Sequence, residues 1–512
     1  MLATPTAENK ADERRPDFDV LIVGAGISGI GMAAHMEMKA PHHTYTIVER
    51  RENLGGTWDL FRYPGIRSDS DMHTLGFDFE PWRHEKSIAD APAILDYLNT
   101  IVDERGIREH IRYGHKVVSA DFREDEARWH VEMELEDGST TRLTANFVYL
   151  GSGYYDYDEP YDAGFELGEF KGQVLHPQFW PDDLDYTNKR IVVIGSGATA
   201  VTIVPSMAEK AAHVTMLQRT PTWMWARPAK DAIANFLRKV MPDGLAYRLT
   251  RMKNIKMQDL SFKMAREKPE KVKAQLTGGI EKALGDKFEP ETFAPPYNPW
   301  DQRVCLVPDE DLFTAMKAGK ASIVTGQIEA FEANGIRLKT GELLEADIII
   351  TATGLKMAIA GKINMSLNGE PVNFAEHFYY KGCMFSNLPN LAVVFGYLNA
   401  SWTLRADINS DYVCRVLNHM RKTGTNIAVP VLTPEAEAAI EEDDVFDFSS
   451  GYIQRSKHIM PKNSISYPWR LNQEYVIDRK QMANDPVDDD LLTFRVAKGA
   501  ASEPAEELEA AE

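Results

Sequence analysis

Three glycines near the amino-terminal end have the spacing of a pyrophosphate-binding turn. The segment GAGISG places them at Gly24, Gly26 and Gly29, and Ser28 precedes the third. The first permits a tight turn, the second lets backbone N–H groups approach a pyrophosphate, and the third lets a helix pack on a strand. Glu49 follows, where a carboxylate accepts hydrogen bonds from the ribose hydroxyls. The spacing predicts a dinucleotide site, and the alternative is a fortuitous glycine-rich turn.

A second glycine-rich segment, GSGATA, has the same spacing but different ribose chemistry. The strand after it ends in Arg219 and Thr220 where an acid is usual. A guanidinium binds a 2′-phosphate through two hydrogen bonds, so this site is predicted to prefer NADPH to NADH, unless Arg219 is a surface ion pair. The opposite ribose chemistry of the first site predicts FAD there. The residues assigned to NADPH are Gly195, Ser196, Gly197, Ala198, Thr199, Ala200, Arg219 and Thr220.

Each glycine segment must be held by a strand, a helix and a second strand. An apolar run rich in β-branched residues precedes each turn, helical spacing follows it, and strand character then resumes. A third strand pair is expected to close the second unit, after which the chain is expected to rejoin the first. The predicted strands lie at 19–23 and 45–49 in the first unit, and at 190–194, 213–218 and within 336–354 in the second.

This order predicts an α/β protein with two Rossmann-like dinucleotide-binding domains, one for FAD and one for NADP, and a helical insertion in the NADP domain. The predicted boundaries are a disordered amino-terminal segment 1–17, an FAD-binding part 18–160, a linker 161–189, an NADP-binding domain 190–354 with the insertion at about 228–292, a second FAD-binding part 355–495, and a disordered acidic tail 496–512.

The insertion is basic within an acidic protein. Between Lys230 and Lys287 there are 14 Lys and Arg residues against 7 Asp and Glu, whereas the whole chain has a net charge of −20. The pattern favours a solvated helix surface. Attraction of a polyanionic cofactor, or contact with a membrane surface, is the functional alternative.

Composition excludes several classes of protein. With 512 residues, 44% of them apolar, the chain has enough apolar surface for buried cores, and the net charge of −20 argues against a nucleic-acid partner. The cysteines Cys305, Cys383 and Cys414 are far apart, which argues against a disulfide scaffold, a zinc module or a CxxC redox centre. The longest uncharged apolar run, 20–34, is shorter than the roughly 20 residues needed to span a bilayer, and no signal-peptide pattern is present. We therefore expect a cytoplasmic protein without a transmembrane segment.

Two longer segments carry a resemblance to a known family. Residues 170–182 match the FxGxxxHxxxWP fingerprint, and residues 55–69, GGTWDLFRYPGIRSD, match a second signature. In both, the chain resembles the type I Baeyer–Villiger monooxygenases, which are class B flavoprotein monooxygenases. Segments 297–313 and 396–407 are most similar to the subgroup that contains the ethionamide-activating monooxygenase. The fingerprint residues are Phe170, Gly172, His176, Trp180 and Pro181.

The resemblance implies that Arg303 and Asp69 are catalytic. In the family, the matching Asp orients an active-site Arg, and a fixed guanidinium stabilises both the C4a-peroxyflavin anion and the charge that develops on a ketone oxygen. The alternative for Arg303 is an ordinary structural ion pair. Cyclic-ketone enzymes usually carry a Lys before the Arg that helps to hold the NADPH phosphate. Here that position is Gln302, so a weaker NADPH preference is expected.

The resemblance also supplies further FAD contacts. Val117 is similar to the strand residue whose backbone contacts the adenine, and its alternative is a plain core valine. The fingerprint lies away from the flavin in the family, so His176 and its neighbours are assigned a structural and conformational role. No second His or Cys stands at ligand spacing beside His176, so no metal is expected. The residues assigned to FAD are Gly24, Gly26, Ser28, Gly29, Glu49, Gly56, Thr57, Trp58, Asp59, Leu60, Arg67, Ser68, Asp69 and Val117.

The resulting hypothesis is an FAD- and NADPH-dependent monooxygenase. It inserts one oxygen atom of O2 next to a ketone carbonyl to give an ester or lactone, and it also sulfoxidises thioethers. One alternative is an N- or S-oxygenating flavin-containing monooxygenase. The other is a redox-inactive FAD/NADP-binding module, against which the intact glycines of both sites count. The expected partners are a small-molecule ketone or thioether and O2.

Overall fold

The computed structural model describes residues 15–446 and 448–497. The disorder predicted for the two ends falls mostly on 1–14 and 498–512, outside the described residues. Within the predicted amino-terminal segment, Asp17 is tied to the first sheet, because its backbone N–H donates to Oγ1 of Thr144 at 3.0 Å.

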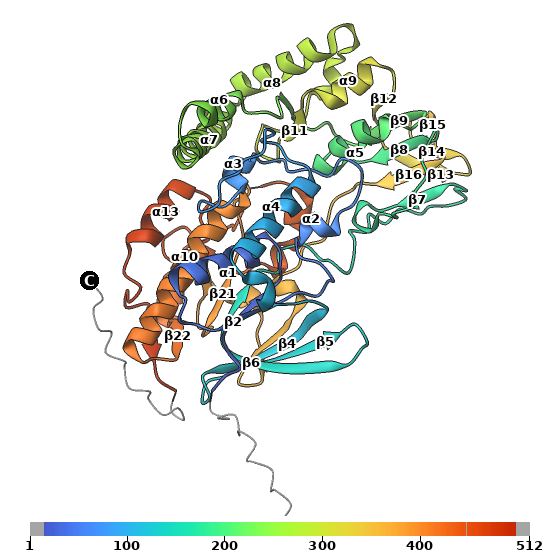
Figure 1. Cartoon of the computed structure of the whole chain (residues 1–512). Helices are drawn as coiled ribbons and strands as arrows, with labels where there is room; N and C mark the ends of the chain where they lie inside the picture. Colours follow the sequence, from blue (N-terminus) through green and yellow to red (C-terminus); the bar gives the residue numbers. More distant parts are fainter. Residues whose placement is uncertain (1–14, 447, 498–512) are drawn as a thin grey trace, which may run out of the picture.

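The first sheet has nine strands, which come from two separate parts of the chain, residues 18–150 and 364–393 (Figure 1). Its parallel part contains β1, whose residues 20–23 are buried, as expected for a strand covered on both faces. Strands β4, β5 and β6 form an antiparallel meander beside it. The strands are β1 (Phe18–Val23), β2 (Tyr45–Val48), β3 (Ile111–Arg112), β4 (His115–Arg123), β5 (Arg128–Leu135), β6 (Thr140–Leu150), β17 (Asn364–Leu367), β18 (Glu370–Pro371) and β21 (Leu391–Val393).

Helices from distant parts of the chain cover this sheet. Helix α1 packs against α10, and the two share one apolar core with α4. Figure 1 shows these helices as a layer on one side of the sheet. The elements are α1 (Ile27–Lys39), α2 (Thr57–Leu60), α3 (Met72–Leu75), α4 (Ala91–Glu104), α10 (Trp402–Thr423), α11 (Pro434–Glu437), α12 (Gly451–Ser456), α13 (Tyr475–Asn484), and strands β19 (Tyr379–Tyr380), β20 (Met384–Phe385), β22 (Ile427–Pro430), β23 (Glu442–Asp443), β24 (Asn463–Ser464) and β25 (Leu492–Arg495).

The second sheet has five parallel strands in the order β12-β9-β8-β16-β7. Helix α5 packs on one face, and a three-stranded antiparallel sheet, β13-β14-β15, covers the other. The elements are β7 (Gln173–Leu175), β8 (Arg190–Ile194), α5 (Ala198–Ala208), β9 (His213–Gln218), β10 (Met224–Arg227), β11 (Cys305–Pro308), α9 (Asp311–Lys317), β12 (Ala321–Thr325), β13 (Ile328–Glu332), β14 (Gly335–Leu338), β15 (Leu343–Glu345) and β16 (Ile348–Thr351).

The two sheets confirm the predicted α/β class with two Rossmann-like units, but two details differ. Residues 173–175, inside the predicted linker, form the edge strand β7, which pairs with β16. Three residues are too few to show a strand period, so no pattern in the sequence indicated this strand. Of the strand pair predicted within 336–354, only β16 joins the parallel sheet. Strand β14 turns back into an antiparallel sheet, because its apolar side packs on the opposite face.

The helical insertion consists of α6 (Ala232–Val240), α7 (Asp243–Glu267) and α8 (Pro269–Leu284). These helices lie at the end of the molecule away from β4, β5 and β6 (Figure 1). Helix α7 packs on α3, and Arg251 donates to the backbone carbonyls of His73 at 3.0 Å and Gly76 at 2.6 Å. The insertion is therefore anchored to the segment that follows Asp69.

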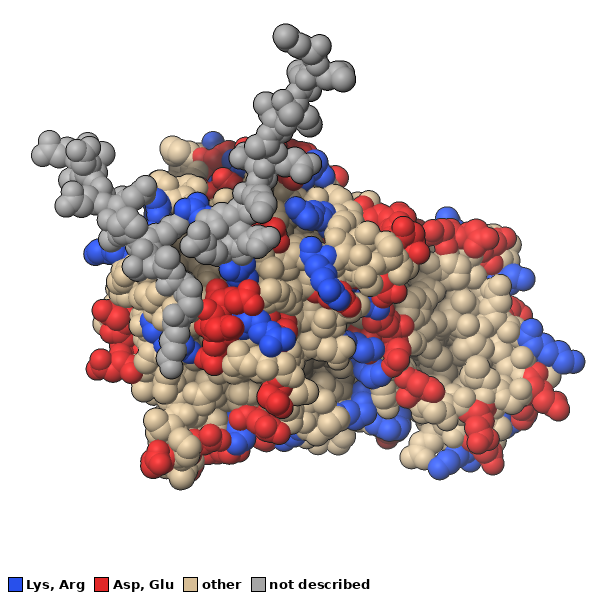
Figure 2. Space-filling view, turned by 90° about the horizontal axis from the view of Figure 1, so that it is seen from below, with Lys and Arg blue, Asp and Glu red and all other residues tan. Residues whose placement is uncertain are grey.

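Acidic and basic side chains are interspersed over the face seen from below in Figure 2. Among the described residues, no helix combines the length and the apolar character that crossing a membrane requires.

The contact between helix α1 and the turn before it predicts opposite effects of two glycine substitutions. A Cβ atom at Gly29 would lie 1.8 Å from the carbonyl oxygen of Gly24, whereas one at Gly278, within α8, would meet nothing within 4 Å. Gly29→Ala should lower the free energy of unfolding by more than about 2 kcal/mol. Gly278→Ala, the matched control, should raise it by about 0.5 to 1 kcal/mol. Urea unfolding followed by circular dichroism measures both, and equal stability of the two variants would contradict the packing described.

Candidate active site

The first glycine segment lies at one cavity, of about 240 Å³, at the carboxyl end of β1. Its wall also includes the loop after β2 and the segment after β6. An added Cβ at Gly24 would lie 2.9 Å from the carbonyl oxygen of Gly151, so there is no room for a side chain where these loops meet. Of the residues assigned to FAD, those in the wall are Gly24, Gly26, Ser28, Glu49, Gly56, Thr57, Trp58, Ser68, Asp69 and Val117.

Glu49 stands at the end of β2 and is 4% exposed. Its carboxylate accepts the backbone N–H of Ala25 at 2.8 Å and that of Arg51 at 3.0 Å. Burial raises the pKa of Glu49, and these two bonds act in the opposite direction. The carboxylate therefore fixes the glycine turn and also faces the cavity.

The second glycine segment lines a larger cavity, of about 970 Å³. An added Cβ at Gly197 would meet nothing within 4 Å, so the backbone opens toward free space there. Arg219 is exposed and has no ion-pair partner among the described residues. Of the residues assigned to NADPH, those in the wall are Gly195, Ser196, Gly197, Ala198, Thr199, Arg219 and Thr220, and Gln302 lies there too.

Asp69 and Arg303 line both cavities. An Nη1 of Arg303 donates to Oδ2 of Asp69 at 3.1 Å, and the two side chains are 35% and 38% exposed. Burial alone would lower the pKa of Arg303, but the Asp69 carboxylate outweighs it and holds that pKa above its ordinary value. Nε of Arg303 is buried without a hydrogen-bond partner in the described part of the chain. The pair thus places a permanent cation where the two cavities meet.

Helix α7 forms hydrogen bonds with both loops that carry this pair. Asn254 donates to Oδ1 of Asp71 at 2.8 Å, two residues after Asp69. Arg266 donates to Oδ1 of Asp301 at 3.0 Å, two residues before Arg303. The loops that carry Asp69 and Arg303 are therefore both hydrogen-bonded to one helix of the insertion.

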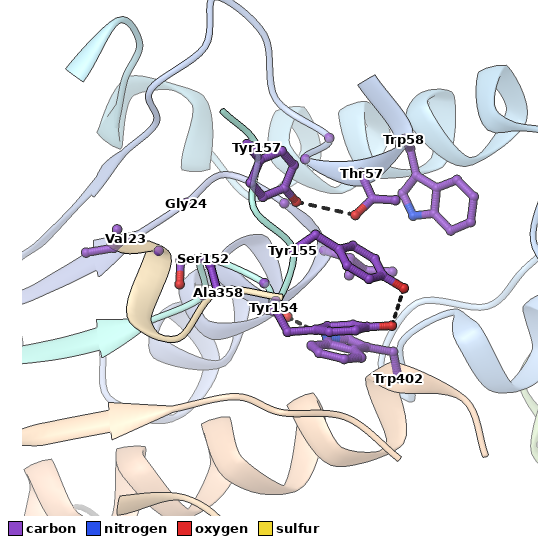
Figure 3. A pocket seen from close by; sticks show the side chains of 18 of the residues that line it. Val23, Gly24, Thr57, Trp58, Ser152, Tyr154, Tyr155, Tyr157, Ala358 and Trp402 are labelled. Atoms are coloured by element: carbon purple, nitrogen blue, oxygen red, sulfur yellow. Dashed lines mark hydrogen bonds between the residues drawn. The ribbon is translucent and has the colours of Figure 1, made fainter. Parts of the chain in front are cut away.

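Aromatic side chains form a wall of the first cavity (Figure 3). Tyr154 stacks on Trp402, with ring centroids 5.1 Å apart and 16° between the planes. Nε1 of Trp402 donates to Oγ of Ser28 at 2.8 Å, and the hydroxyls of Tyr154 and Tyr155 are hydrogen-bonded to each other. Burial raises the pKa of both tyrosines, so their hydroxyls stay protonated at neutral pH. Sequence reasoning missed this wall, although the segment GSGYYDYD directly follows a buried strand.

Several of the assigned residues lie outside the expected wall. Asp59 faces away and pairs with Arg51 at 2.8 Å, and Leu60 packs against the core of the second sheet. Arg67 lines the second cavity, not the first, and pairs with Asp311. Gly29 and Ala200 sit beneath the two turns and line neither cavity.

The fingerprint residues Phe170, Gly172, His176, Trp180 and Pro181 also line neither cavity. They flank β7, and an added Cβ at Gly172 would lie 2.3 Å from the carbonyl oxygen of Asp347. Nδ1 of His176 accepts the backbone N–H of Gln178 at 3.2 Å, and burial lowers the pKa of His176. Their assigned conformational role stays a prediction. In the part of the chain that the structure describes, no group of three or more His, Cys, Asp and Glu side chains has the arrangement of a metal site.

The chain is similar in sequence to a known protein family and to FAD-binding and FAD-containing monooxygenases. Residues 21–278 match the protein family described as pyridine nucleotide-disulphide oxidoreductase. The chain is 48% identical over 479 residues to a probable FAD-binding monooxygenase AlmA of Acinetobacter sp, covering 93% of this chain and 96% of the relative. It is 47% identical over 488 residues to the FAD-containing monooxygenase EthA of Mycolicibacterium smegmatis, covering 95% and 98%.

Solved structures share the fold. An oxidized steroid monooxygenase bound to NADP superposes with a TM-score of 0.75 at 21% identity, over 94% of this chain and 99% of that chain. A cyclohexanone monooxygenase bound to ε-caprolactone superposes with a TM-score of 0.71 at 20% identity, over 93% and 99%.

The cysteines of this chain are free and buried, in contrast to the dithiol chemistry in the name of the matched family. Cys305 lines the second cavity, and burial raises the pKa of all three thiols to about 12. A thiol with that pKa is roughly one part in 10⁴ thiolate at pH 8.

The folded protein is therefore expected to leave its thiols unmodified by a disulfide reagent at pH 8, and to expose all three on unfolding. Ser139→Cys is the control, because Ser139 is exposed and a thiol there should react at once. Rapid reaction of a native cysteine in the folded protein would contradict the burial described.

Proposed function

Because this chain belongs to the FAD-containing monooxygenase family, we propose that it binds FAD and NADPH and inserts one oxygen atom of O2 next to a ketone carbonyl. The ketone, O2, NADPH and a proton would give an ester or lactone, NADP⁺ and water. We further propose that it oxidises thioethers to sulfoxides at the same site, and that it acts in the cytoplasm.

The residues of both cavities fit these cofactors. In the first cavity, glycine backbone without side chains suits a pyrophosphate, and the Glu49 carboxylate suits the hydroxyls of a ribose. In the second, Gly197 leaves open space and Arg219 offers an unpaired guanidinium for a 2′-phosphate. We accordingly assign FAD to residues 18–160 with 355–495, and NADP to residues 190–354. Thr57 and Trp58, which line both cavities, would lie between the two cofactors.

The ion pair of Arg303 and Asp69 carries the proposal. It is in the walls of both cavities, so it faces the place where the two cofactors and a substrate would meet. Bound FAD would supply hydride acceptance from NADPH and the activation of O2. Arg303 would bind the ketone oxygen and stabilise the negative charge that develops there, and Asp69 would hold the guanidinium in place. The Tyr154 and Trp402 side chains would keep water out of the adjoining wall.

Heteroatom oxygenation alone is the second candidate function. Transfer of oxygen to an amine or thioether creates no anionic carbonyl oxygen, so it would not need a fixed cation at this place. A guanidinium that Asp69 holds in the walls of both cavities favours the ketone reaction. A redox-inactive binding module is the remaining alternative, and bleaching of the yellow holoenzyme by NADPH under nitrogen would exclude it.

Arg303→Ala is expected to abolish ester formation, with a loss of roughly 10² to 10³ in rate or more. NADPH oxidation should continue and yield hydrogen peroxide, because the glycine segments are untouched. Asp69→Ala should give the same uncoupling in milder form, since it positions the guanidinium. Ester and peroxide yields per NADPH measure both. Arg142→Ala removes a surface ion pair whose guanidinium is 81% exposed and should leave the yields unchanged. A normal ester yield from Arg303→Ala would favour heteroatom oxygenation.

Arg219→Ala is expected to raise the KM for NADPH by roughly 10- to 100-fold, because a charge-assisted contact with the 2′-phosphate is lost. NADH lacks that phosphate and serves as the internal control, so its KM should barely change. An equal rise in KM for the two nucleotides would show that Arg219 does not bind the 2′-phosphate.

A further inference from the structure

The outer surface of α6 and α7 carries an unusual concentration of exposed apolar side chains. Eight of the 16 large apolar side chains exposed among the described residues belong to these two helices. We define the α6–α7 face by them: Ile233, Phe236, Val240, Leu245, Met252, Met257, Leu260 and Met264. Phe236 is 61% exposed and Leu260 57%, so these side chains are not cryptic core residues. Neither lines a cavity of the candidate active site.

The apolar residues gather on the solvent sides of the two helices. In α6, Ile233, Phe236 and Val240 follow an i, i+3, i+7 spacing, and Met257, Leu260 and Met264 repeat it in α7. The opposite side of α7, which includes buried Arg251 and Asn254, faces α3 and the Asp71 segment. Each helix thus has an apolar side that nothing in the described chain covers.

Three exposed cations accompany this apolar face, Lys239, Arg248 and Lys256. Among the described residues none of them forms an ion pair within 4.0 Å, although Lys239 lies close enough to Glu85 to add to the lowering of the pKa of that carboxyl by Lys230. The three cations belong to the segment with 14 basic and 7 acidic residues in a chain of net charge −20. Apolar side chains beside unpaired cations are typical of helices that lie in the interface of an anionic bilayer. In a two-fold dimer through this face, by contrast, the same cations would approach each other.

We propose that the α6–α7 face docks on the surface of an anionic lipid bilayer. Phe236 and its apolar neighbours enter the headgroup region, and Lys239, Arg248 and Lys256 contact lipid phosphates. The helices lie at the end of the molecule away from β4, β5 and β6 (Figure 1). Since α7 also braces the loops of Asp69 and Arg303, the docked face lies on the helix that positions the catalytic pair.

Vesicle flotation of the holoenzyme tests this proposal. The probes are vesicles of phosphatidylcholine alone, or with about one third phosphatidylglycerol. The holoenzyme should float with the anionic vesicles only, and about 1 M salt should release it, because the Debye length falls to about 3 Å. Failure to float with anionic vesicles, or equal flotation with both kinds, would overturn the proposal.

Two sets of variants separate the charge from the apolar contribution. Changing Lys239, Arg248 and Lys256 together to Glu should lower the partition constant by at least about 100-fold. Changing Ile233, Phe236 and Val240 together to Ser should lower it by at least roughly tenfold. The matched control changes Lys189, Lys210 and Lys339 to Glu, because these lysines are exposed and lie outside the face; it should still float.

Flavin absorbance and NADPH oxidation in each variant report that it is folded, so a loss of flotation with both retained supports the proposal. Equal flotation of the charge variant and the wild-type protein would overturn it. Sedimentation velocity tests the other possible occupant of the α6–α7 face, a second copy of this chain. A dimer of the holoenzyme that the apolar variant dissociates would assign the face to a second copy of this chain and overturn the lipid assignment.

Discussion

The ion pair between Arg303 and Asp69 fixes a cation where the two cavities meet. The proposed oxygen insertion requires a guanidinium that is held in one place and whose charge faces the cavities and not bulk water. Both conditions are met where the two cavities share a wall. Each sheet places its glycine turn at one of the two cavities, and the loops that carry Asp69 and Arg303 reach both.

The insertion explains how those loops are held. Asp69 lies in an irregular segment before α3, and Arg303 lies in another before β11, so neither is fixed by a sheet. Hydrogen bonds from Asn254 to Asp71 and from Arg266 to Asp301 supply the missing restraint. A segment that is mostly exposed and basic thus has one side committed to the active site. Its other side is free for the lipid contact proposed here.

Sequence reasoning predicted what depends on local spacing. The glycine turns, Glu49 at the end of β2, and the strands at 190–194 and 213–218 follow from short-range patterns, and the pairing of Arg303 with Asp69 followed from a family resemblance. It missed what depends on long-range packing. The stacking of Tyr154 on Trp402 joins residues far apart in the chain, and β7 forms only because β16 offers it an edge. The pairing of Asp59 with Arg51 likewise could not be read from local spacing, and the assignment of Asp59 to FAD stays a prediction.

Isotope labelling tests whether the site proposed here inserts oxygen into a carbon skeleton. The holoenzyme would be given NADPH, a ketone and ¹⁸O2, and the product analysed by mass spectrometry against NADPH consumed. We expect an ester that carries one ¹⁸O atom, with one ester formed per NADPH in the coupled reaction. Unlabelled ester, or hydrogen peroxide as the sole product across linear, cyclic and aryl ketones, would contradict this expectation.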